Sequence, residues 1–103
     1  MLNGRKRRPT HPGELLRKDI LPAARLTQVE LARRIGVSRR SISEIVHERR
    51  PVTIDMAHRL ARAFGTTPEF WLNLQQAVDL WDAMEENSKQ YDRIRPMASG
   101  KVA

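Results

Sequence analysis

The chain of 103 residues contains no cysteine and few aromatic residues. The absence of cysteine excludes disulfide bonds and thiolate metal sites, and it is typical of proteins in a reducing compartment. No apolar run approaches the ~20 residues that a membrane-spanning helix needs. The basic N-terminus is not followed by the apolar core of a secretion signal. These absences favour a cytoplasmic protein without a membrane partner.

Lysine and arginine are absent from residues 66–88, which hold five acidic residues. In contrast, residues 1–65 hold 15 Lys/Arg and six Asp/Glu, and residues 89–103 hold four Lys/Arg and one Asp. The whole chain therefore carries a formal charge of +7. A basic body joined to an acidic segment indicates two surfaces with different partners.

Groups that would support catalysis or hold a cofactor are also lacking. His11, His47 and His58 do not have the spacing of metal ligands. Asp55, close to His58, is better explained as an acid in the first turn of a helix. The sequence has no glycine-rich loop for phosphates and no nucleophile with an evident base. We therefore expect no enzymatic activity, no cofactor and no metal site.

Capping and turn residues divide the chain into five predicted helices and no strand. The first covers residues 14–21 and is predicted to end at Pro22. The second follows a capping box of Thr27 and Glu30 and stops at Gly36, and the third runs from Ser38 to about residue 47. The fourth covers residues 54–64, and the last runs from residue 66 or 67 to about 87. The positions expected to face inward are Leu15, Leu16, Ile20, Leu21, Val29, Leu31, Ala32, Ile35, Ile54, Ala57, Leu60, Ala61 and Phe64.

The second and third predicted helices match the spacing of a helix-turn-helix, with Gln28 as the first position. The fifth position, where the two helices cross, requires a small side chain and is Ala32. The ninth, where the chain turns sharply and often with positive φ, is Gly36. The other apolar positions of the motif are Leu31, Ile35, Val37, Ile42 and Ile45. Seven matches in register strongly favour a helix-turn-helix.

The third predicted helix carries its polar residues on one arc and its aliphatic residues on another. A solvated amphipathic helix would show the same pattern, but the helix-turn-helix register turns the polar arc toward a major groove. Arginine pairs with guanine O6 and N7, and hydroxyl groups suit phosphates. The predicted base contacts are Gln28, Arg39, Arg40, Ser43 and His47, and the predicted phosphate contacts are Thr27, Ser38, Ser41, Arg49 and Arg50. Glu44 either accepts a hydrogen bond from a cytosine amino group or orients an arginine.

The acidic last helix carries more apolar surface than packing on one small bundle requires. Its apolar stripe contains Phe70, Trp71, Leu74, Ala77, Val78, Trp81 and Met84. Either both tryptophans are core residues, or part of the stripe is a self-association surface. Helix-turn-helix proteins need such a surface in order to bind two half-sites.

Four sequence blocks resemble the HigA-type antitoxin family, which includes virulence-associated protein I and belongs to the XRE class of Cro/CI-like helix-turn-helix repressors. The blocks are HPGELLRKDILPA, GVSRRSIS, TIDMAHRLARAFG and TTPEFWLNLQQAVDLW, within residues 11 to about 82. The helix-turn-helix alone is generic, whereas HPGE and PEFWLNLQ make the resemblance specific. It implies an all-α, five-helix, λ-repressor-like DNA-binding domain with the helix-turn-helix in helices 2 and 3.

The resemblance further implies a homodimer that represses its own operon at a palindromic operator on double-stranded DNA. It also implies a partner, a HigB- or RelE-like toxin that cleaves mRNA, which the chain neutralises. By position, Phe70, Trp71, Leu74 and Leu80 match the family's C-terminal core and dimer contact, and Trp81 of the apolar stripe joins them. The alternatives are a repressor without a toxin and a pure protein-interaction module, which the helix-turn-helix register disfavours.

Two features lie outside the family pattern. After the recognition helix the family often has Asn-Gly-Arg, whereas this chain has His47, Glu48 and Arg49. Loss of that glycine is expected to alter the turn and to bring Glu48 near a phosphate. Residues 1–10, with the basic run 5–8, are predicted to be a flexible arm that is either solvated or in contact with DNA. The predicted organisation is this arm, a domain over residues 11–88 with a C-terminal dimerisation helix, and a flexible tail over 89–103.

Overall fold

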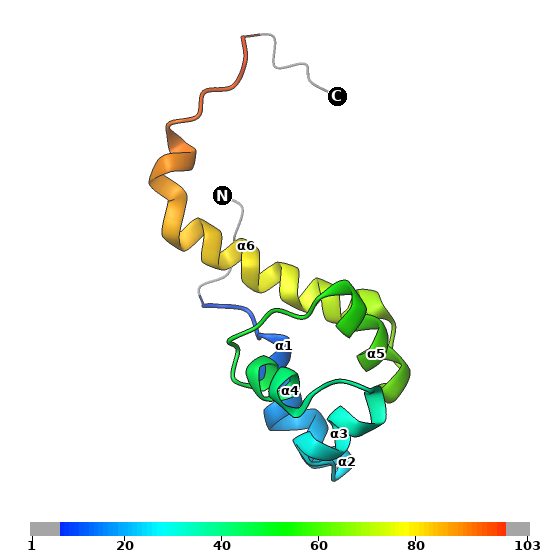
Figure 1. Cartoon of the computed structure of the whole chain (residues 1–103). Coiled ribbons are helices and arrows are strands. Elements are labelled where there is room, and N and C mark those ends of the chain that lie inside the picture. Colours follow the sequence, from blue (N-terminus) through cyan, green and yellow to red (C-terminus); the bar gives the residue numbers. More distant parts are fainter. Residues whose placement is uncertain (1–6, 99–103) are drawn as a thin grey trace.

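The computed structural model describes residues 7–98, and all its regular elements in that range are helices (Figure 1). The first helical rod consists of α1 (Pro12–Leu15), the π-helical turn η1 (Leu16–Ile20) and α2 (Leu21–Ala24). It is followed by α3 (Gln28–Ile35), α4 (Arg39–Val46), α5 (Ile54–Phe64) and α6 (Pro68–Asp92). The expected all-α, five-helix architecture with a helix-turn-helix, here α3 and α4, is confirmed.

The first helical rod passes through Pro22 and does not end before it, so this predicted boundary was wrong. Proline lacks an N–H donor and crowds the preceding turn of a helix. Here the N–H of Leu21 donates to the carbonyl of Leu16, one residue further back than in an α-helix, and Pro22 then stands in the first turn of α2. The wider π-turn accommodates the proline. The rod ends at Arg25, whose φ of 55° is left-handed.

The capping box predicted at the start of the second helix is confirmed. Thr27 Oγ1 accepts from the N–H of Glu30 at 3.1 Å, and the Glu30 carboxylate accepts from the N–H of Thr27 at 2.9 Å. These hydrogen bonds hold the pKa of Glu30 below its usual range. Side chains of Ser38, Thr53 and Thr67 cap the three helices that follow. Each cap satisfies a backbone donor that the first turn of a helix leaves free.

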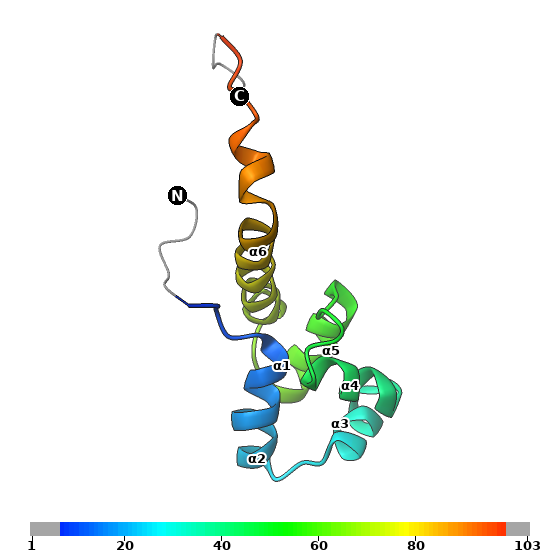
Figure 2. The same cartoon turned by 90° about the vertical axis from the view of Figure 1, so that its left-hand side faces the viewer.

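The last helix is longer than predicted and continues to Asp92, past the expected end near residue 87. Residues 89–92 are therefore helical and do not belong to a flexible tail. Figure 2 shows that α6 projects well beyond the remaining helices. The predicted flexibility of residues 1–6 and 99–103 concerns segments outside the described residues. Within residues 7–98, no helix combines the length and apolarity needed to cross a bilayer.

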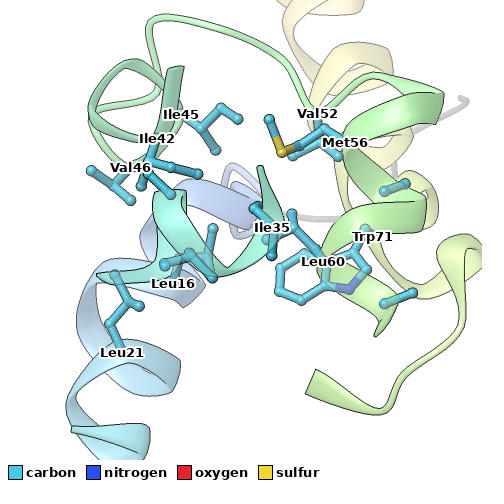
Figure 3. Close-up of a cluster of buried hydrophobic side chains, with 14 residues drawn as sticks. Leu16, Leu21, Ile35, Ile42, Ile45, Val46, Val52, Met56, Leu60 and Trp71 are labelled. Carbon is cyan, nitrogen blue, oxygen red and sulfur yellow. The ribbon is translucent and has the colours of Figure 1, made fainter. Parts of the chain in front are cut away.

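One hydrophobic core joins all the helices, and Figure 3 shows Leu16, Leu60 and Trp71 converging in it. Leu16 comes from η1, Leu60 from α5 and Trp71 from the start of α6, and all three are fully buried. Two residues expected inside, Val29 and Ile54, are exposed. Both lie in the first turn of their helices, where the chain enters from solvent, so periodicity alone misplaced them.

Candidate nucleic-acid interface

The helix-turn-helix unit is built around a left-handed turn at Gly36. Gly36 has φ 72° and ends α3, while Leu31, Ile42 and Ile45 are fully buried between α3, α4 and the rest of the core. Arg59 of α5 secures the turn: its Nη1 donates to the Ile35 carbonyl at 2.6 Å, and its Nε donates to Asp55 at 2.8 Å. A cation at the C-terminus of a helix also complements the helix dipole. The angle between α3 and α4 is thus fixed from both sides.

The N-terminus of α4 carries a cluster of hydroxyl groups. Ser38 Oγ accepts from the N–H of Ser41 at 3.1 Å and lies 2.9 Å from Ser41 Oγ. Arg50, which follows α4 in the chain, donates from Nη1 to the same Ser41 Oγ at 2.9 Å. Backbone N–H groups, hydroxyls and an arginine therefore meet at the N-terminus of α4, a helix of eight residues. Such groups are those that bind phosphate oxygens.

Glu44 lies between two arginines on the exposed side of α4. Its carboxylate is 3.4 Å from Nε of Arg40, one helical turn earlier, and 2.6 Å from Nη2 of Arg50. The structure thus favours the orienting role for Glu44 over a contact with cytosine. Arg40 nevertheless remains 84% exposed, so its guanidinium extends into solvent.

The other predicted DNA-contacting residues are accessible to different degrees. Within residues 7–98, Arg39 is exposed and forms no ion pair, and Arg49 is exposed as well. His47 caps the C-terminus of α4, and its Nδ1 lies 2.7 Å from the carbonyl oxygen of Ser43. Ser43 itself is half-buried. Thr27 and Gln28 begin α3 on the other helix of the unit, and Thr27 Oγ1 is occupied by the capping bond. The structure therefore joins Ser38, Ser41, Glu44, Arg40 and Arg50 into one hydrogen-bonded surface, in whose hydrogen bonds Thr27 does not take part.

The turn after α4 retains a left-handed residue without glycine, contrary to expectation. Glu48 itself has φ 61°, its N–H donates to the Ile45 carbonyl at 2.9 Å, and the N–H of Arg49 donates to the Glu44 carbonyl at 2.8 Å. The Glu48 carboxylate is bound by Arg8 at 2.9 Å and lies 3.7 Å from Arg17. Its charge is therefore paired within the chain, while the expected closeness of Glu48 to a phosphate stays a prediction.

Sequence analysis missed the residues of the first helical rod that support the end of α4. Gly13 packs so closely that a Cβ there would lie 1.8 Å from the Ile45 carbonyl oxygen. Arg17 donates to the carbonyl of Val46. His11 caps the rod, with Nδ1 accepting from the N–H of Gly13 at 2.9 Å, and burial lowers the pKa of the His11 ring. The HPGE block was a signal of family resemblance, and its structural role is to place the first rod against the recognition helix.

The predicted dimer contacts on α6 divide into two groups. Trp71 is fully buried within one chain, and its Nε1 donates to Thr66 Oγ1 at 2.8 Å. Trp71 therefore packs as a core residue of one chain, which is one of the two alternatives stated for the tryptophans of this helix. Phe70 and Leu80 are 40% and 53% exposed, and Leu74 and Trp81 are half-buried. These four residues remain on the accessible side of α6.

Two short packed helices joined by a left-handed glycine, with an arginine-bearing second helix facing solvent, define the helix-turn-helix class of proteins. The family model described as helix-turn-helix matches residues 16–71. Antitoxin HigA-1 of Vibrio cholerae is 39% identical, over 89% of this chain and 87% of that protein. Virulence-associated protein I of Dichelobacter nodosus is 46% identical, over 78% and 72% respectively.

A solved structure of the Pseudomonas aeruginosa antitoxin HigA with the higBA promoter is also similar. It superposes with a TM-score of 0.83 at 42% identity, covering 87% of this chain and 99% of that one. The chain belongs to the helix-turn-helix family, and within it to the group of the HigA-type antitoxins. The family resemblance inferred from the four sequence blocks is thereby confirmed.

Proposed function

We propose that the chain is the antitoxin of a toxin–antitoxin pair and a sequence-specific repressor of its own operon. The observation that carries this proposal is the hydrogen-bonded surface of α4, held at a fixed angle to α3 and rich in arginine. The similarity to an antitoxin solved with its promoter supports it. In this proposal Arg39, Arg40, Ser43, Gln28 and His47 face base edges, and the phosphates are bound by Ser38, Ser41, Arg49, Arg50 and Thr27.

The test of DNA binding is the affinity of the purified chain for the DNA upstream of its own gene, measured by fluorescence anisotropy against a scrambled fragment. We expect a marked preference for the upstream fragment. The logarithm of the affinity should fall linearly with the logarithm of salt concentration, with a slope of about −0.9 per phosphate contact. Equal affinity for both fragments would contradict a sequence-specific repressor.

The toxin partner is tested separately, because no residue pattern marks a toxin contact. A small basic reading frame beside the gene, encoding an RNase-like protein, should co-purify with the chain and lose its toxicity when both are expressed. If no such protein is encoded there and the chain still binds its upstream DNA, the function is that of a repressor without a toxin.

We also propose that two copies associate through the exposed side of α6. Phe70, Leu74 and Trp81 form an apolar strip along one face of a helix of 25 residues that runs past the core, and the exposed Leu80 lies beside it, about 80–120° further round the helix. These residues line two grooves on α6: Leu80 lines one together with Leu72 and Ala83, and Phe70 and Leu74 line the other together with Ala77. A strip between residues 70 and 81 is about 17 Å long, or three turns, at the rise of an α-helix. That length allows a helix of a second copy to pack along it and align two recognition helices on a palindrome.

Leu80→Glu is expected to convert this dimer into a monomer in light scattering, because it places a charge at the most exposed of the four apolar side chains proposed to associate. Leu80 is more than half exposed in one chain, so the substitution should leave the thermal unfolding temperature of the monomer nearly unchanged. Ile54→Glu, at an exposed position on α5, is the matched control and should remain dimeric. A Leu80→Glu variant that stays dimeric would move the interface away from α6.

A further inference from the structure

Arg8 connects two distant parts of the fold through a single guanidinium group. Its Nε and Nη2 donate to the two carboxylate oxygens of Asp82 on α6, each at 2.9 Å. Its Nη1 donates to Glu48, directly after α4, also at 2.9 Å. In Figure 1 the blue segment that carries Arg8 runs from the side of α6 to the start of α1. Hydrogen bonds from Arg8 hold the pKa of Asp82 below its usual range.

Glu48 is the residue at which this connection acts on the DNA-binding surface. Glu48 has φ 61°, in the left-handed region, where an L-residue other than glycine has a conformational free energy roughly 1–2 kcal/mol less favourable than in the right-handed region. Arg8 and Arg17 hold its carboxylate from two sides, and Arg17 also donates to the carbonyl of Val46, the last residue of α4. The next two residues are Arg49 and Arg50, and Arg50 binds Glu44 and Ser41 on the exposed surface of α4.

We propose that Arg8 is a positioning residue for operator recognition. By bridging Asp82 and Glu48, it fixes the turn that carries Arg49 and Arg50 relative to α6. The sequence alone suggested that the basic run 5–8 is either solvated or in contact with DNA. In the structure, the guanidinium of Arg8 instead donates hydrogen bonds to Asp82 and Glu48 of the same chain. This inference rests on the proposed DNA-binding function and adds to it a link between the helix proposed to dimerise and the end of the recognition helix.

The planar fork of arginine is what the bridge requires. It satisfies a carboxylate with two parallel hydrogen bonds and still offers a third nitrogen, whereas the ammonium of lysine is a point charge without this geometry. All three side chains are partly exposed, at 41% for Arg8, 40% for Asp82 and 25% for Glu48, so the bridge contributes little to overall stability. Its effect should appear in operator affinity and not in folding.

The experiment compares Arg8→Lys, Asp82→Asn and the double variant by operator affinity and by affinity for scrambled DNA. Arg8→Lys keeps the charge of the chain, and Asp82→Asn removes a negative charge, which by itself favours DNA binding. We nevertheless expect each variant to bind the operator about three- to tenfold more weakly, the scale of one modest pair interaction. Affinity for scrambled DNA and the salt slope should stay unchanged in Arg8→Lys, and the double variant should be no weaker than either single one.

Glu86→Gln is the matched control, since it removes one charge from the same helix at an exposed position without an ion pair in the described part of the chain. It should not weaken operator binding, and circular dichroism should show all variants folded at the assay temperature. Wild-type operator affinity in Arg8→Lys, or tighter binding in Asp82→Asn, would overturn the proposal and make Arg8 a phosphate ligand or a bystander. Failure of the wild-type chain to prefer its upstream DNA would instead contradict the proposed function.

Discussion

Gly13→Ala is expected to lower the free energy of unfolding by about 3 kcal/mol or more, a large part of the stability of a small domain. The added Cβ would lie 1.8 Å from the Ile45 carbonyl oxygen and 2.8 Å from the Ile45 carbonyl carbon. Both are backbone atoms of α4 that no rotamer change can move. Overpacking a core already costs about 1–3 kcal/mol when side chains can yield. The first helical rod must therefore move away from the recognition helix, or α4 must shift.

Urea unfolding followed by circular dichroism measures this loss. Gly65→Ala is the matched control, because it adds the same methyl group where no atom lies within 4 Å but where φ is 69°. That variant carries only the cost of the left-handed conformation, about 1 kcal/mol. If Gly13→Ala were no less stable than Gly65→Ala, the close contact between the first rod and α4 would be absent in solution.

Arg39→Ala and Arg40→Ala are each expected to weaken operator binding by about 5- to 150-fold, the equivalent of about 1–3 kcal/mol for a lost bidentate contact with guanine. Both arginines are exposed on α4, so the fold should survive. Removing Arg40 also leaves Glu44 with Arg50 as its one arginine partner in the described part of the chain, so the carboxylate beside the DNA is neutralised less well. The double variant should show no detectable shift of the upstream fragment.

The measurement is the ratio of the affinities for operator and scrambled DNA, with thermal unfolding as the test of folding. Arg93→Ala, after α6, removes the same charge far along the chain and should leave the ratio close to that of the wild type. A loss that is equal for both DNA fragments would mean that Arg39 and Arg40 contact phosphates. Wild-type operator affinity in both variants would mean that these arginines of α4 do not contact the operator.

The helix-turn-helix was predictable because its determinants are local. Gly36 must turn the chain, Ala32 must allow the helices to cross, and Thr27 and Ser38 cap helices within three residues of themselves. Pro22 was misjudged because the rule for proline assumes an α-helical turn before it, whereas the turn here is π-helical. The left-handed conformation of Glu48 was missed for a different reason: its carboxylate is held by Arg8 and Arg17, which are not neighbours in sequence.

The supports of the candidate site were not predictable from one sequence. The Arg8–Asp82 pair joins residues 74 positions apart, and the contact between Gly13 and Ile45 is a matter of van der Waals distance between two backbones. Neither leaves a periodic pattern. Glu44 was different: its spacing from Arg40 allowed both a base contact and an ion pair, and only the position of Arg50 favours the second.

The two tryptophans stand on one helix but in different surroundings. The first half of α6, up to the buried Val78, packs against the bundle, so Trp71 is fully buried beside Phe64 and Phe70, while Trp81 beyond it is half-buried. Their fluorescence should accordingly follow separate events, with Trp71 reporting on unfolding and Trp81 on association along α6. The chain thus carries intrinsic optical probes for the two equilibria, and no label needs to be attached to distinguish folding from assembly.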